Sequence, residues 1–179
     1  MYRSYVPGDD LRNLDWKLYA RSDRYFIKKF EDETNRWCYL VVDQSRWMSF
    51  GSLDYSKMEY ARTVAATLAY FLTTQHDAVG VLSFDAEIGD FLPAKLGAKQ
   101  FHQILVELSR PAVGKGTDIV SPLRQVTALV PRRGLILLLS DLLASPDMLK
   151  TQLASLRARG HEVVLLRVLD PAELELGLS

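Results

Sequence analysis

The sequence has little of several features that would place it in a special class of protein. It contains a single cysteine, Cys38, so no disulfide can form within the chain. A lone thiol inside the apolar run 37–42 suits a reducing compartment, and we expect a cytoplasmic location. The first residues lack the long apolar core of a secretory signal, and the longest apolar runs, such as 135–139, are too short to cross a bilayer. We therefore expect no membrane insertion by this segment.

The sequence also lacks an excess of charge of either sign. Lys and Arg together number 22, and so do Asp and Glu, which makes the formal net charge zero. Dedicated nucleic-acid-binding domains carry a basic surplus that contacts phosphates, so we expect no nucleic-acid partner. Hydrophobic residues make up 48% and charged residues 25% of the 179 residues, a balance typical of one globular domain with a sizeable core.

Two kinds of apolar pattern alternate along the chain from residue 37 onward. Short continuous apolar runs indicate buried strands at 37–42, 78–84, 135–139 and 161–168, and the tight link after 84 predicts a hairpin with 87–92. Apolar residues at three- and four-residue spacing indicate helices within 58–72, 101–108, 119–130 and 149–156. This alternation predicts an α/β fold, a Rossmann-like, doubly wound and mostly parallel sheet with helices on both faces and one antiparallel edge strand.

The first 35 residues show no clean period. They contain a turn at 7–10, a short helical turn at 14–20 and a loosely alternating stretch at 25–30 that could form an edge strand. We expect residues 1–35 to form a leading segment packed on a domain of residues 36–179.

Polar side chains follow the apolar strands at the point where each strand ends. Asp43 and Ser45 follow 37–42, Asp141 follows 135–139, and Thr117 precedes the third helix. Ligands of doubly wound sheets bind beyond the carboxyl ends of the strands, where the strand order reverses. Two carboxylates in one pocket repel each other, and Mg²⁺ would relieve that repulsion while accepting hydroxyl ligands. The alternative is that both aspartates cap the following loops through backbone N–H groups, and spacing alone does not decide between the two.

The order of these residues resembles a known site. Asp43-Gln44-Ser45, then Gly116-Thr117, then Asp141 resembles the metal-ion-dependent adhesion site of von Willebrand factor A domains. A more specific series precedes it, namely Gly8, Asp9, Asp10, Arg12, Asp15, Trp16 and Arg21. On this series the chain is identified as a member of a prokaryotic family catalogued as domain of unknown function fifty-eight, whose genes commonly accompany MoxR-type AAA+ ATPases. The resemblance implies a von Willebrand factor A-like fold, a protein partner that is a MoxR-type ATPase or its client, and no established catalytic activity.

The chain departs from the family's adhesion motif at one position. The motif is Asp-x-Ser-x-Ser, and Trp47 stands where the second serine would supply a hydroxyl. An indole has only an N–H donor and cannot ligate a cation. The candidate metal ligands for Mg²⁺ therefore are Asp43, Ser45, Thr117 and Asp141, one hydroxyl short of the motif. Trp47 and Ser49 are candidate partner-binding residues, because Trp is enriched in interface hot spots; the alternative for Trp47 is simple packing against its loop.

Two other classes of function compete with a binding module. A phosphoryl-transfer enzyme of the haloacid dehalogenase type would need a second carboxylate at position 45, and the Gly114–Thr117 loop lacks the first glycine of a phosphate-binding loop. The three histidines stand in no recognisable order with a nucleophile, so we expect no enzyme. A metal-free structural scaffold is the other alternative, in which the signature residues between 8 and 21 form a network that fastens the leading segment to the domain.

Overall fold

The computed structural model describes residues 2–4, 6, 19–21, 25–28, 36–85, 87–111 and 119–175. The chain divides into two compact units, Met1–Thr34 and Asn35–Ser179, so the observed boundary falls one residue before the predicted one. In the first unit, β1 (Tyr2–Ser4) and β2 (Phe26–Lys28) form an antiparallel pair. The predicted strand at 25–30 thus pairs locally with β1 and is not an edge of the main sheet. The helical turn predicted at 14–20 lies largely outside the described residues.

The second unit contains a five-stranded sheet. Its strands are β3 (Trp37–Asp43), β4 (Ala78–Phe84), β5 (Ile88–Lys95), β6 (Leu135–Ser140) and β7 (Glu162–Arg167), in the spatial order β5-β4-β3-β6-β7. All neighbours are parallel except β4 and β5, which form the predicted antiparallel hairpin. The chain moves from β3 to β4 on one side and later returns to place β6 on the other, so the strand order reverses between β3 and β6.

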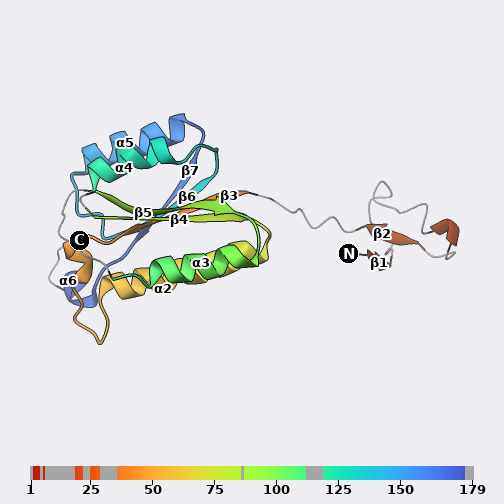
Figure 1. Ribbon diagram of the computed structural model, residues 1–179, viewed down its shortest axis with the longest axis horizontal. Helices are drawn as coiled ribbons and strands as arrows, with labels where there is room; N and C mark the ends of the chain where they lie inside the picture. The colour runs from red at the N-terminus through yellow and green to blue at the C-terminus, as the bar shows by residue number, and fades with distance from the viewer. Residues whose placement is uncertain are drawn as a thin grey trace. The chain divides into compact units, whose positions relative to one another are not determined.

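Helices cover both faces of this sheet. Figure 1 shows α2 (Lys57–Thr74) and α3 (Ala98–Leu108) on one face, and α4 (Val120–Leu129) and α5 (Pro146–Ala158) on the other. Two short elements lie outside these layers, the 3-10 helix η2 (Arg46–Ser49) and the terminal helix α6 (Pro171–Glu175). The predicted doubly wound architecture is therefore confirmed. Among the described residues, no helix combines the length and the apolar character that a membrane span requires.

Alternate residues of the central strands pack into two separate cores. In β3, Leu40 and Val42 join the core under α2 and α3, whereas Tyr39 and Val41 join the core under α4 and α5. This division follows from the two-residue period of a strand. Because both faces are buried, these strands have no polar alternation, which is why they appear in the sequence as continuous apolar runs.

Candidate functional site

The two predicted carboxylates follow neighbouring strands at the point where the strand order reverses. Asp43 ends β3, and Asp141 directly follows β6, which pairs with β3 in the register Val42 to Leu139. The two strand ends are joined directly, because the Ser140 hydroxyl donates a hydrogen bond of 2.5 Å to Asp43 Oδ2. The structure thus places both carboxylates at the position where α/β folds bind ligands.

Asp43 is buried, at 2% exposure, and its carboxylate accepts two hydrogen bonds. One comes from the Ser140 hydroxyl and the other, of 2.8 Å, from the backbone N–H of Ser45 to Oδ1. Burial raises the pKa of Asp43 above its ordinary value, and the hydrogen bonds from Ser140 and Ser45 only partly oppose this shift. The bond from the Ser45 N–H is a capping contact of the kind expected under the alternative interpretation of this aspartate.

Asp141 is paired with Lys57, a residue that no charge pattern or motif spacing in the sequence indicates as part of the site. The ammonium of Lys57 lies 3.0 Å from Asp141 Oδ2, and both residues are almost fully buried. Oδ1 of the same carboxylate accepts the backbone N–H of Leu143 at 3.2 Å. The signal in the sequence for finding Lys57 is its position directly after Ser56, the serine that caps α2.

A third carboxylate reaches the same lysine from the end of the chain. Glu173 of α6 places Oε1 at 2.7 Å from Lys57 Nζ. Asp170, which precedes α6, accepts the Ser52 hydroxyl at 2.5 Å and the Ser52 N–H at 2.8 Å. These bonds connect α6 to the loop before α2, and Figure 1 shows α6 at the same end of the sheet as the start of α2. Sequence reasoning missed α6, because a five-residue helix is too short to show a period.

We call Asp43, Ser140, Asp141, Lys57 and Glu173 the strand-end cluster. The other predicted site residues lie partly outside it. Ser45 is buried beside Asp43, whereas Trp47 and Ser49 are exposed on η2. Thr117 lies outside the described residues, as do the signature residues Gly8, Asp9, Asp10, Arg12, Asp15 and Trp16. Arg21, the last residue of the signature, is described and exposed. The predicted role of the signature stays a prediction.

The arrangement around Lys57 fits a divalent cation poorly. An ammonium group lies between Asp141 and Glu173, and like charges repel strongly where water is scarce. Both oxygens of Asp43 already accept hydrogen bonds. Within the part of the chain that the structure describes, no three Asp, Glu, His or Cys side chains gather in the manner of a metal cluster.

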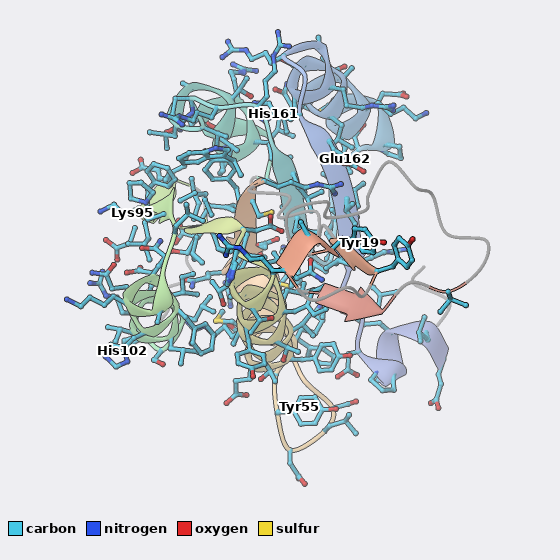
Figure 2. The ribbon with its side chains drawn as sticks, turned by 90° about the vertical axis from the view of Figure 1, so that its right-hand side faces the viewer. Tyr19, Tyr55, Lys95, His102, His161 and Glu162 are labelled. Carbon is cyan, nitrogen blue, oxygen red and sulfur yellow. The ribbon has the colours of Figure 1, made fainter. Side chains whose placement is uncertain are left out.

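Large apolar side chains are exposed around this cluster. Five of them come from η2, the loop before α2 and the first turn of α2: Trp47, Phe50, Leu53, Tyr55 and Tyr60. We call these five residues the aromatic rim. Each is about half exposed, and the rings of Tyr55 and Tyr60 stack with centroids 6.2 Å apart. Figure 2 shows Tyr55 on the loop that leads into α2, away from the sheet.

A hollow connects the rim with the buried charges. It has a volume of ≈ 380 Å³ and is lined by Leu53, Tyr55, Lys57, Tyr60, Arg167 and Pro171, among others. The hollow therefore combines aromatic side chains with the cations Lys57 and Arg167 and the carboxylate of Asp170.

The chain is similar in sequence to uncharacterized bacterial proteins. The chain is 28% identical to an uncharacterized protein of Mycobacterium tuberculosis over 177 residues, which cover 97% of this chain and 55% of that protein. It is 27% identical to the uncharacterized protein YeaD of Bacillus subtilis over 107 residues, or 60% of this chain and 25% of that protein. The chain thus spans about half the length of the mycobacterial relative.

Two solved structures share the architecture. A conserved hypothetical protein BatB from Bacteroides thetaiotaomicron superposes with a TM-score of 0.61 at 19% identity, covering 74% of this chain and 66% of that one. An aerotolerance-related membrane protein from Bacteroides fragilis superposes with a TM-score of 0.62 at 20% identity, covering 74% and 67%. At this identity the likeness concerns the fold, which is von Willebrand factor A-like. The family model described as "Protein of unknown function DUF58" matches residues 1–178, and the chain belongs to that family.

Proposed function

We propose that this domain is a protein-binding module, and not an enzyme, that docks a partner at the end of the sheet where the strand-end cluster and the aromatic rim lie. The observation that carries the proposal is the rim itself. Five large apolar side chains within residues 47–60 are about half exposed, although burial of such groups is the main source of folding free energy. Large exposed apolar side chains grouped in one segment, with charged groups beside them, are typical of protein interaction sites.

The composition of the rim supports a protein partner. Tyr and Trp are enriched at the centres of interfaces, where a large rigid side chain contributes contact area at a low cost in conformational entropy. Trp47 is the largest member and is 52% exposed. Its indole therefore retains enough accessible surface to act as an anchor, whereas a Trp that only packs against its own loop would be mostly covered.

The distribution of titratable groups favours binding over catalysis. Asp43 and Asp141, which a hydrolytic or phosphoryl-transfer enzyme would use, already accept hydrogen bonds or pair with an ammonium. The histidines are dispersed: His102 lies on α3 and His161 precedes β7, and Figure 2 shows the two far apart. General acid–base catalysis requires such groups within hydrogen-bond reach of one reacting centre.

For the partner we propose a MoxR-type AAA+ ATPase or its client, on the basis of the family to which the chain belongs. The test is the affinity of this domain for the MoxR-type ATPase of the same organism, measured by biolayer interferometry with native protein and Trp47→Ala. We expect a loss of about tenfold or more in affinity, as for other interface anchors, with an unchanged melting temperature.

Phe71→Ala is the matched control, because Phe71 is an equally exposed aromatic residue near the opposite end of α2. Its affinity should equal that of the native protein. Equal affinities for Trp47→Ala and the native protein would refute the role of the rim, and no binding by the native protein would reject this partner.

A further inference from the structure

We propose that the ammonium group of Lys57 is the cation of the strand-end site, in the place of a divalent metal ion, and that Glu173 is the carboxylate bound to it. The charge arrangement itself stands on the geometry of three buried or half-buried side chains, Lys57, Asp141 and Glu173.

The distances make Lys57 the centre of this arrangement. Its Nζ atom donates hydrogen bonds of 3.0 Å to Asp141 Oδ2 and 2.7 Å to Glu173 Oε1. The side chain of Lys57 is 2% exposed and that of Asp141 is 3% exposed, so water contributes little to the solvation of this pair. A buried carboxylate needs a compensating positive charge, and here a covalently attached one supplies it.

Lys57 does not stabilise α2 through its position in the helix. Ser56 caps α2 through a capping box with Glu59, so Lys57 is the first residue of the helix. A cation at this end lies next to the positive pole of the helix dipole, which is unfavourable. Burial of a lysine there therefore requires a compensating interaction elsewhere, and the two carboxylates provide it.

Glu173 is held in place independently of the lysine. Its second oxygen, Oε2, accepts the backbone N–H of Asp170 at 2.9 Å, and Asp170 in turn binds Ser52. The carboxylate is therefore directed at Lys57 by the start of α6. Lys57 thus lies between a carboxylate at the end of a strand, Asp141, and a carboxylate of the terminal helix, Glu173.

The departures from the adhesion motif agree with this assignment. Trp47 removes one hydroxyl ligand, and a divalent ion placed beside the Lys57 ammonium would meet a like charge between side chains that are only 2% and 3% exposed. The tethered ammonium instead supplies a positive charge that needs no free metal.

The test is titration of Mg²⁺ and Mn²⁺ into the native protein and into Lys57→Met. Calorimetry measures the heat of metal binding, and thermal unfolding measures the change in melting temperature. We expect no heat of binding and no shift in melting temperature for the native protein. Lys57→Met leaves Asp141 without its cation and should melt about 10 °C lower, and Mn²⁺ should raise its melting temperature again. Metal binding by the native protein, or a folded Lys57→Met that gains no affinity for Mn²⁺, would overturn the proposal.

Two further variants serve as controls for the effect of Lys57→Met. Lys57→Met/Asp141→Asn removes both members of the buried pair, so it should melt close to the native protein and gain no affinity for Mn²⁺. Lys150→Met removes a lysine of an exposed pair with Asp147 and should change nothing. If Lys57→Met does not fold, the titration of the native protein decides. The titration contains no partner protein and therefore does not test docking. Metal binding by the native protein would reject the role of Lys57 and leave the docking proposal standing.

Discussion

Removal of the Ser140 hydroxyl tests the connection between the two strand ends. Ser140 is fully buried, and its Oγ atom both donates to Asp43 Oδ2 and accepts the backbone N–H of Leu142 at 3.0 Å. Ser140→Ala removes both bonds without adding volume. It leaves the Asp43 carboxylate with hydrogen bonds from Ser45 alone and deprives Leu142 of its acceptor.

The cost can be estimated from these two bonds. A hydrogen bond to a charged group contributes about 1.5–3 kcal/mol and an unpaired, partly buried N–H costs about 1 kcal/mol, so we expect a loss of about 2–4 kcal/mol in unfolding free energy. For a protein of this size this corresponds to a fall in melting temperature of about 5–15 °C.

The loss should also depend on pH. The pKa of Asp43 is raised in the folded state, chiefly by burial, so the stability associated with this group is present below its unfolded pKa and is lost as the pH rises through the folded pKa. The Ser140 hydroxyl lowers that pKa, and Ser140→Ala therefore raises it further. The difference between native protein and variant should grow as Asp43 ionises.

The assay is urea unfolding of both proteins at about pH 5 and about pH 8. Ser83→Ala is the control, because Ser83 is a buried serine of the neighbouring strand β4 and makes no hydroxyl hydrogen bond within the described part of the chain. It should cost less than about 1 kcal/mol at either pH. An equal cost for the two variants, or a cost for Ser140→Ala that shrinks toward alkaline pH, would refute this interpretation.

Three further predictions concern positions around the sheet. Burial raises the pKa of the Cys38 thiol to about 12, so a disulfide reagent at about pH 8 should leave the native protein unmodified and react fully only after unfolding in guanidinium. Gly80→Ala should destabilise by about 1–3 kcal/mol in thermal unfolding, because a Cβ atom there would lie 2.6 Å from the backbone nitrogen of Ala94 on β5. The hydrogen bond from the Ser52 hydroxyl lowers the pKa of Asp170, so stability from this group is present above its ordinary pKa and is lost as the pH falls. Asp170→Asn should therefore unfold more easily than the native protein at neutral pH, and urea titrations should show the gap closing in acid.

The sheet and its four long helices were predictable because burial on both faces leaves a strong pattern. The strand predicted at 78–84 is observed with these bounds, and the strand at 37–42 is one residue longer because Asp43 still pairs within the sheet. The last strand is observed at Glu162–Arg167, within the predicted 161–168. The convergence of Asp43 and Asp141 also follows from sequence, because the ends of neighbouring parallel strands meet at one edge of a sheet.

The cation at this edge was not predictable in the same way. Lys57 and Asp141 are 84 positions apart, and Glu173 is 116 positions from Lys57, so no local pattern relates them. A charged residue in the first turn of a helix is ordinarily solvated, and only tertiary packing shows that Lys57 is buried. The strand predicted at 25–30 is observed as β2 (Phe26–Lys28), but its pairing with β1 was not predictable, because alternation does not specify the partner strand.

Hydrogen–deuterium exchange of the native domain with and without the MoxR-type ATPase tests the central claim most directly. Docking at the strand-end edge predicts slower exchange of residues 44–60, which carry the aromatic rim and the start of α2, with little change in α4 and α5. Protection confined to α4 and α5, with residues 44–60 exchanging as in the free protein, would contradict it.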